Sequence, residues 1–346
     1  MTSVLVVNAG STSLKLSAVG EDGRSRDLDS LADAPVDVIA VGHRVVHGGP
    51  SLRAPLLLDD RSLAELRSLV DLAPLHNAPA LDAIDEARLA LPAVPHVAVF
   101  DTEFHATMPE EASTYAVPER WRSQWNVRRY GFHGLSVQWA SEQVPVDRLV
   151  VCHLGGGCSV SAVLRGRSVD TTMGFSPLEG VAMATRSGSL DPAAILYLLR
   201  RGVGSPDELE HALERESGLL ALSGLSAAVE ELERSDEPAA QLALDVYCYR
   251  IASAIGCMAV ALGGVDAIVF SGGVGEGSAR VRASVCRRLG FLGVELDNGL
   301  NGKAVANAEI AGAGSRVRVV VVQAREDVVA ARAVRALLAS RSTSPG

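Results

Sequence analysis

The chain contains 346 residues, of which 48% are hydrophobic and 21% are charged, and its formal net charge is −9. This length favours two domains, and the apolar content is sufficient for a large folded core. The negative charge argues against a nucleic-acid-binding protein, because phosphate backbones require a basic surface.

The beginning of the chain and its cysteines indicate a cytoplasmic protein. The first residues lack the basic region of a signal peptide, and the five cysteines show neither a CxxC pair nor zinc-finger spacing. The most membrane-like stretch, residues 251–270, is interrupted by Ser253, Gly263, Gly264 and Asp266. We therefore expect a buried helix followed by a strand there, and no membrane partner.

The first predicted elements form a β-hairpin. Residues 4–7 are a continuous apolar run, residues 8–13 form a polar turn, and residues 14–19 alternate in hydrophobicity. The turn offers hydroxyl groups and backbone N–H groups to a ligand.

The same pattern returns about half a chain later. An apolar strand at residues 149–154 leads into a glycine-rich turn at 155–159 and a second strand at 160–164. Such self-similarity indicates internal duplication. We therefore predict an α/β fold with two related lobes that close on one ligand.

Helices and two further strands are predicted between and after these hairpins. Asn77 and Pro79 are expected to begin a helix through residues 80–90, Asp191-Pro192 a second, and the capping box at residues 205–208 a third. Strands are predicted at residues 267–270 and 317–322, and a closing helix at residues 326–338.

Three turns of small residues, at 8–13, 155–159 and 271–277, each follow an apolar strand. Glycine allows the backbone to approach an anion, and successive N–H groups form a concave phosphate site. One such turn is usually only a turn, but three of them, one beside Lys15, favour phosphate binding. The sequence contains no GxxxxGK[ST] motif, so it is not a P-loop enzyme, and residues 273–277 are a poor Rossmann fingerprint.

Two arginines and one aspartate stand out among the charged residues. Arg44 and Arg186 lie in glycine- and histidine-rich or hydroxyl-rich segments, and each can either bind an anion or form a structural ion pair. Asp101 follows an apolar strand, where it can face a ligand or cap the next element. The histidines show no zinc-binding spacing.

Eight segments of the chain and one further residue, taken in order, resemble the motifs of the acetate kinase family. These are residues 8–15, 43–49, 72–77, 100–105, 130–134, 170–180, 185–188 and 272–277, together with Glu326. The resemblance implies the fold of the actin-like sugar kinase and Hsp70 superfamily, with a ligand cleft between duplicated lobes, in a homodimer. It also implies reversible phosphoryl transfer from ATP to the carboxylate of acetate, giving acetyl phosphate and ADP.

The resemblance also implies roles for individual residues. Asp101, His133, Arg186 and Arg44 correspond to the catalytic set, with the arginines binding carboxylate and phosphoryl oxygens and Asp101 orienting Arg44. A carboxylate nucleophile is already ionised at neutral pH, so no base is required. The residues implied in binding the small acid are Arg44, Val46, Leu75, His76, Phe132 and Pro177.

The nucleotide and its metal have their own implied residues. Asn8 and Glu326 would hold Mg²⁺ or Mn²⁺, partly through water. The residues implied in contacting ATP or ADP are Ser11, Ser13, Lys15, His153, Leu154, Gly155, Gly156, Gly157, Gly273, Val274, Gly275, Glu276 and Gly277. The acid side and the first phosphate turn are expected in an N-terminal lobe, residues 1–101 plus 329–346. Nucleotide binding and dimerisation are expected in residues 102–328.

The sequence departs from the family pattern mainly on the nucleotide side. The departures are Gly156, Ala228, Glu230, Gly277, Arg325 and a shorter segment between Val19 and His43. Where this chain has Glu230, the family has an arginine that contacts the adenosine. They leave open another donor, such as GTP or pyrophosphate, and another acid, such as propionate or butyrate. A degenerate regulator that binds ligand without turnover is a further hypothesis. Against it stand the retained residues Arg44, Asp101, His133, Arg186 and Glu326.

Overall fold

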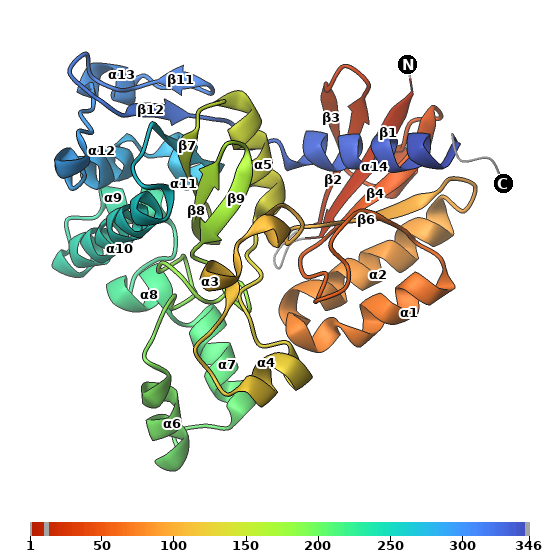
Figure 1. Cartoon of the computed structure of the whole chain (residues 1–346), viewed down its shortest axis with the longest axis horizontal. Coiled ribbons are helices and arrows are strands. Elements are labelled where there is room, and N and C mark those ends of the chain that lie inside the picture. Colours follow the sequence, from red (N-terminus) through yellow and green to blue (C-terminus); the bar gives the residue numbers. More distant parts are fainter. Residues whose placement is uncertain (1, 10–13, 343–346) are drawn as a thin grey trace. The chain divides into compact units, whose positions relative to one another are not determined.

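The computed structural model describes residues 2–9 and 14–342, except for the side chains of Pro74, Leu75 and Ser342. The chain divides into two compact units. The first comprises Met1–Ala106, Phe132–Trp139 and Arg325–Gly346, and the second comprises Thr107–Gly131 and Ala140–Ala324. Each unit contains one six-stranded mixed sheet (Figure 1).

The strands of the first sheet, in spatial order, are β3 (Ser25–Leu28), β2 (Leu14–Gly20), β1 (Ser3–Ala9), β4 (Val38–Val45), β6 (His96–Phe100) and β5 (Leu56–Leu57). Those of the second sheet are β11 (Ala308–Glu309), β12 (Arg318–Val321), β10 (Ala267–Ser271), β7 (Arg148–Leu154), β8 (Cys158–Leu164) and β9 (Arg167–Thr171).

The two sheets have the same topology. In the first, β1 pairs antiparallel with β2 and parallel with β4, and β4 pairs parallel with β6. In the second, β7 pairs antiparallel with β8 and parallel with β10, and β10 pairs parallel with β12. The predicted α/β fold with duplicated lobes is therefore confirmed, as are both hairpins.

Helices complete each unit. The first contains α1 (Asp60–Ser68), α2 (Pro74–Ala90), the beginning of α5 (Gly134–Gln143) and α14 (Glu326–Ser342). The helices of the second unit are α3 (Glu110–Ser113), α4 (Glu119–Trp125), α6 (Pro192–Arg200), α7 (Pro206–Arg215), α8 (Gly218–Ser223), α9 (Val229–Arg234), α10 (Pro238–Leu262), α11 (Gly272–Gly277), α12 (Ala279–Arg287) and α13 (Asn298–Gly302).

The core of the first unit follows from the two-residue period of β1. Val4 and Val6 lie on the face covered by α14, whereas Leu5 and Val7 lie on the face covered by α2. A strand buried on both faces has no polar alternation, which explains the continuous apolar run in the sequence.

Helix α10 accounts for the longest apolar stretch of the chain. By length and composition it could cross a membrane, but 56% of its most apolar window is buried within the structure. It packs against β7, β8 and β9. The predicted buried helix followed by a strand is confirmed, since β10 begins soon after it.

Three predictions about helices are wrong. Helix α2 begins at Pro74 rather than at Asn77, because proline suits a first helical turn and the Asn77 side chain bonds to the backbone of His47 instead of capping. Residues 272–277 form a short helix, not an open turn. Helix α14 continues to Ser342, beyond the predicted end at residue 338.

Candidate active site

An arginine–aspartate pair lies at the carboxyl edge of the first sheet. Arg44 is near the end of β4 and Asp101 directly follows the neighbouring parallel strand β6, so both reach the same edge. Arg44 Nε donates to Asp101 Oδ1 at 2.8 Å, and Arg44 Nη2 donates to Oδ2. The Asp101 side chain is only 1% exposed and that of Arg44 14%.

Asn8 and Glu326 surround the other side of the Arg44 guanidinium. Asn8 stands opposite Arg44 in the β1–β4 register, and its Oδ1 accepts a hydrogen bond from Arg44 Nη1 at 2.9 Å. Glu326 Oε2 lies 3.7 Å from the same Nη1 and accepts from Asn8 Nδ2 at 3.4 Å. The structure therefore brings together both sequence-predicted metal residues and two of the predicted catalytic residues.

The charges of this cluster stabilise one another. Burial disfavours the charged form of Arg44, but Asp101 and Glu326 outweigh it and raise the pKa of Arg44 above its ordinary value. Burial raises the pKa of Asp101, and the Arg44 charge opposes that rise. A bidentate pair of this kind holds the arginine fork in a fixed plane.

Ser136 is a member of the cluster that the sequence analysis missed. Its hydroxyl donates to Glu326 Oε1 at 2.6 Å, and the residue is buried near the start of α5. Serine in a first helical turn commonly caps the helix, so nothing in the local pattern marks it as a partner of a residue 190 positions away.

The oxygen atoms of Asn8 and Glu326 suit a hard divalent cation such as Mg²⁺. Within residues 2–9 and 14–342, no group of three or more His, Cys, Asp or Glu residues gathers as a metal site. A magnesium ion here would thus need most of its ligands from water and phosphate, which is how Mg²⁺ is usually held beside nucleotides.

The segment around His133 is fixed against the same aspartate. Gly134 N donates to Asp101 O at 2.9 Å, and the backbone of His133 donates to the Asp101 carboxylate, which lowers the pKa of Asp101. His133 has a φ of 59°, so its backbone adopts the left-handed region. This unfavourable conformation for a non-glycine residue indicates a segment held by its surroundings.

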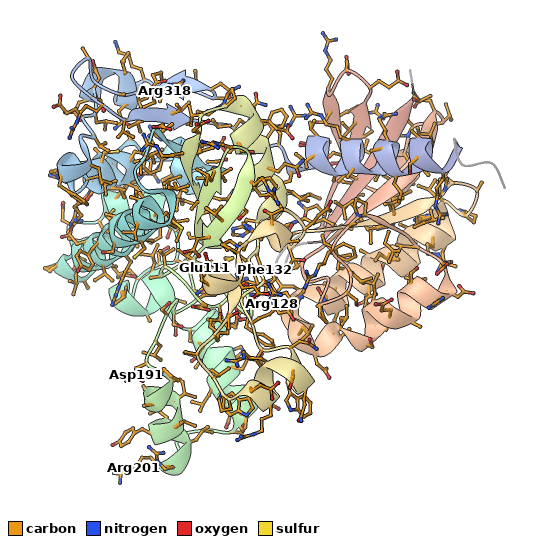
Figure 2. All side chains as sticks on the ribbon, viewed as in Figure 1. Glu111, Arg128, Phe132, Asp191, Arg201 and Arg318 are labelled. Carbon is orange, nitrogen blue, oxygen red and sulfur yellow. The ribbon has the colours of Figure 1, made fainter. Side chains whose placement is uncertain are left out.

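The predicted acid-binding residues of the first unit are largely buried. The ring of Phe132, labelled in Figure 2, makes an edge contact with the His47 ring at a centroid distance of 5.3 Å. Val46, His76 and Phe132 are all buried. The side chain of Leu75 lies outside the described part of the structure.

The first phosphate turn is only partly described. Ser11 and Ser13 lie outside the described residues, whereas Lys15 is exposed on β2 and stands opposite Asn8 in the β1–β2 register. The Lys15 backbone is thus adjacent to that of Asn8, which in turn contacts Arg44.

In the second unit, Arg186 lies beside Pro177 and Glu214. Arg186 Nη1 donates to Pro177 O at 3.5 Å, and Arg186 Nε lies 2.8 Å from Glu214 Oε2. Burial lowers the pKa of Arg186, and the Glu214 carboxylate opposes that effect. The sequence analysis predicted Arg186 and Pro177 but missed Glu214, which lies in the last turn of α7.

A second group of polar side chains holds the segment that carries Pro177. Arg129 donates to the carbonyl oxygens of Thr171 and Thr172 and pairs with Glu179 at 2.9 Å. The Tyr115 hydroxyl donates to the other oxygen of Glu179. Residues 171–179 are therefore fixed at both ends, by residues that the sequence analysis did not select.

Two glycine-rich segments meet at the carboxyl edge of the second sheet. His153 and Ser271 are register partners on the parallel strands β7 and β10, so the segments that follow them begin side by side. A Cβ on Gly272 would lie 2.7 Å from Leu154 O, which shows how closely they approach. The structure thus brings the residues of 153–157 together with those of 272–277.

Glu276 and Gly156, two of the predicted nucleotide residues, have different surroundings. Glu276 Oε1 accepts from the backbone of Gly272 and of Ala324, both at 3.0 Å, so its side chain also stabilises the short helix α11. Gly156 has no atom within 4 Å of its Cβ position, so the turn has space for a larger side chain there.

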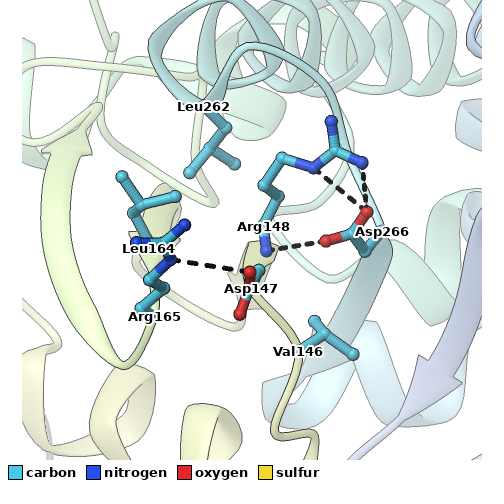
Figure 3. A pocket seen from close by; sticks show the side chains of 7 residues that line it. All are labelled: Val146, Asp147, Arg148, Leu164, Arg165, Leu262 and Asp266. Atoms are coloured by element: carbon cyan, nitrogen blue, oxygen red, sulfur yellow. Dashed lines mark hydrogen bonds and ion pairs between the residues drawn. The ribbon is translucent and has the colours of Figure 1, made fainter.

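A surface depression lies at the opposite edge of the second sheet (Figure 3). Its charged residues pair with each other, Arg148 with Asp266 and Arg165 with Asp147. Arg148 begins β7 and Asp266 precedes β10, so the depression is at the amino ends of strands whose carboxyl ends carry the glycines. Ligands of open α/β sheets bind at the carboxyl ends.

Comparison with known sequences identifies one family. The sequence profile of the acetokinase family matches residues 24–332. The acetate kinase of Acaryochloris marina is 44% identical over 322 residues, covering 88% of this chain and 80% of that protein. The acetate kinase of Deinococcus radiodurans is 49% identical over 296 residues, covering 82% and 74%.

Solved structures give the same result for the fold. A propionate kinase from Francisella tularensis superposes with a TM-score of 0.90 at 30% identity, covering 96% of this chain and 99% of that one. The acetate kinase of Porphyromonas gingivalis superposes with a TM-score of 0.85 at 30% identity, covering 98% and 100%.

Proposed function

We propose, from the premise that this chain belongs to the acetokinase family, that it transfers the γ-phosphoryl group of ATP reversibly to acetate, giving acetyl phosphate and ADP. The observation that carries this proposal is the buried Arg44–Asp101 pair with Asn8 and Glu326 at the same sheet edge. This cluster offers a fixed cation for anionic reactants together with oxygen ligands for a metal.

The proposed roles follow from the charge that phosphoryl transfer develops. Such transfer requires mostly positioning and charge neutralisation, which Arg44 and Arg186 supply by binding carboxylate and phosphoryl oxygens. His133 is proposed to donate to the phosphoryl oxygens as charge spreads over them. Asp101 holds the Arg44 fork in plane and accepts no proton, because the acetate nucleophile is already ionised.

A magnesium ion, or manganese, is proposed to bind through Asn8 and Glu326. When bound, it would neutralise charge on the nucleotide phosphates. Ser136 would orient the Glu326 carboxylate through its hydrogen bond, as outer residues of metal sites commonly do.

Val46, Leu75, His76, Phe132 and Pro177 are proposed to contact the acid. Propionate and butyrate are alternatives to acetate. The likeness to a propionate kinase is a reason to test propionate. One methylene group changes pocket affinity by about 1–3 kcal/mol, so we expect a graded preference and not exclusive use of one acid.

The proposed donor is ATP, bound by Ser11, Ser13 and Lys15 and by the glycine-rich segments of the second unit. The altered residues leave GTP and pyrophosphate as alternative donors. Glu230, one of them, forms an exposed ion pair with Arg234 within α9. Restoring an arginine there, by Glu230→Arg, should raise the preference for ATP over GTP if this position contacts the nucleoside.

A cytoplasmic homodimer is the proposed state of the protein. Helix α6 has an apolar sequence but contains no buried residue, and Leu196 and Tyr197 are 53% and 55% exposed. Asp191 and Arg201 mark its two ends in Figure 2. An exposed apolar helix is typical of an association surface. Light scattering during gel filtration should report twice the chain mass, and a monomer for Leu196→Glu.

The deciding experiment is the trapping of acyl phosphate by hydroxylamine. Purified protein is incubated with Mg²⁺, acetate and ATP, with propionate, butyrate, GTP and pyrophosphate as parallel arms and EDTA as the metal control. Product with acetate and ATP supports the proposal, and product with another donor alone assigns the altered residues to donor choice. No product from folded protein in any arm would favour a regulator that binds without turnover.

A further inference from the structure

Arg186 lies in a loop whose backbone is fixed by main-chain hydrogen bonds. Thr185 O accepts from Ser217 N at 2.9 Å, Ser187 N donates to Leu213 O at 3.0 Å, and Met183 N donates to Arg186 O at 3.1 Å. The first two bonds attach the loop to the start of α8 and the end of α7, and the third closes the loop on itself. The path of the loop therefore does not depend on the ion pair that Arg186 makes.

The guanidinium of Arg186, in contrast, is held at one edge by the carboxylate of Glu214. Nε lies 2.8 Å from Glu214 Oε2, with side chains 12% and 10% exposed, and Nη1 reaches Pro177 O at 3.5 Å. The Glu214 carboxylate raises the pKa of Arg186, whereas the positive charge of Arg215 lowers it. Without Glu214, the buried Arg186 charge would lose this carboxylate while the repulsion from Arg215 remained.

We infer that Glu214 is a positioning residue for Arg186, which it holds by Nε so that the remaining edges of the guanidinium face the phosphoryl group. This inference rests on the proposed function, because it needs Arg186 to bind a transferring phosphoryl group. An arginine fork held at one nitrogen keeps its plane and loses less freedom when it binds an anion. The carboxylate also keeps the buried charge compensated before a nucleotide is bound.

Positioning of this kind has a kinetic signature. A misplacement of about 1 Å near the reacting atoms can lower the rate about 100-fold. Ground-state binding of ATP depends on many other contacts and should change less. The loss is therefore expected in kcat and not in KM.

The test compares three variants by steady-state acyl phosphate formation from acetate and ATP. Glu214→Ala should lower kcat about 10- to 100-fold, with the KM for ATP within about threefold of the wild type. Glu214→Gln should lose less, because the amide oxygen still accepts from Nε. Glu210→Gln is the matched control, one turn earlier on α7 and exposed, and should behave as the wild type.

A double-mutant cycle with Arg186→Lys completes the test. If Glu214 acts through Arg186, the combined loss should be smaller than the product of the separate losses. Independent losses, a Glu214→Ala kcat within twofold of the wild type, or a loss confined to KM would each overturn the inference. If Glu214→Ala does not fold, as judged by circular dichroism, the Glu214→Gln cycle decides. An inactive wild type would instead refute the proposed function.

Discussion

At the scale of single residues, the proposed chemistry depends on the buried pair of Arg44 and Asp101. Asp101→Asn keeps the size of the side chain but removes the carboxylate nearest to the Arg44 charge, at a position that is 1% exposed, and leaves Glu326 3.7 Å from Nη1. Removing one partner of a buried pair costs about 3–5 kcal/mol of the free energy of unfolding. Misorientation of the arginine should lower kcat about 100- to 1,000-fold.

Urea unfolding and acyl phosphate formation measure the two effects of Asp101→Asn separately. Asp27→Asn on the exposed strand β3 is a suitable control, since it also removes one negative charge from the first unit. An Asp101→Asn protein with the turnover of the wild type would contradict the role assigned to this pair.

Protonation of Glu103 makes the free energy of unfolding depend on pH. Burial raises its pKa from 4.5 to about 7, and no compensating cation contributes. The folded state therefore binds the proton more tightly than the unfolded state. This contribution to stability is full below about pH 4.5 and is lost as the pH rises through about 7.

Glu103→Gln should remove this loss, because the amide stays neutral at every pH. Between pH 5 and pH 8 the free energy of unfolding of the wild type should fall relative to the variant by about 2–3 kcal/mol. The buried His43 and His105, with pKa values lowered to about 3 and about 4, favour stability at higher pH in both proteins. The difference between the two urea-unfolding series isolates Glu103, and parallel curves would exclude its role.

The sequence was informative about residues with a local motif and silent about their distant partners. Arg44, Asp101 and Arg186 could be selected because small or polar neighbours set them apart. Ser136 and Glu214 could not be selected, because each acts through one contact made by the folded chain. Glu214 resembles any other glutamate on the polar face of a helix.

At the scale of elements, local patterns predicted type and approximate position well. The capping box of α7 was readable because Ser205 and Glu208 bond reciprocally to backbone groups within four residues. The start of α2 was misplaced because Asn77 looks like a cap but bonds to His47 across the fold. Such an error follows whenever a tertiary hydrogen bond uses a residue with a strong local preference.

The Arg186 loop supplies a test at this scale through the glycine that begins α8. Gly218 has a φ of 63°, and a Cβ there would lie 2.2 Å from Met183 O and 2.8 Å from Arg186 O. Gly218→Ala should therefore displace the loop and lower kcat at least 10-fold, in addition to destabilising the protein. Gly224→Ala is the matched control, because its φ is 64° but its Cβ would meet no atom within 4 Å.

Only the backbone strain is common to the two substitutions. It should lower the free energy of unfolding by about 1 kcal/mol in Gly224→Ala and leave kcat unchanged. Equal kinetic losses in both variants would mean that left-handed strain, and not the clash with the Arg186 loop, determines the effect.

At the scale of the whole molecule, the duplicated strand–turn–strand pattern predicted two related sheets, and the structure confirms them. The pattern did not predict which helices cover the sheet of each unit. Helix α14 is the last helix of the chain, and it covers strands β1, β4 and β6 from the N-terminal part of the chain. Hydrophobic periodicity shows that a helix has a partner, but it does not identify a partner about 300 residues away.

Substitutions at Gly42 and Val334 test the packing of α14 on β4 directly. A Cβ at Gly42 on β4 would lie 2.8 Å from Val334 Cγ2 on α14, and Val334 is fully buried. Gly42→Ala should therefore destabilise the protein by about 1–3 kcal/mol through overpacking, and Val334→Ala by about 2 kcal/mol through the space it leaves. In the double variant the new methyl group occupies part of that space, so urea unfolding should show a loss smaller than the sum by about 1 kcal/mol.

Val319→Ala is the control, because Val319 is buried on β12 in the second unit. Its loss in the free energy of unfolding should add to that of Gly42→Ala. If the losses were additive both for Gly42→Ala with Val334→Ala and for Gly42→Ala with Val319→Ala, α14 would accommodate the Gly42→Ala methyl group by moving as a whole. The packing of Val334 against Gly42 would then not determine the position of β4.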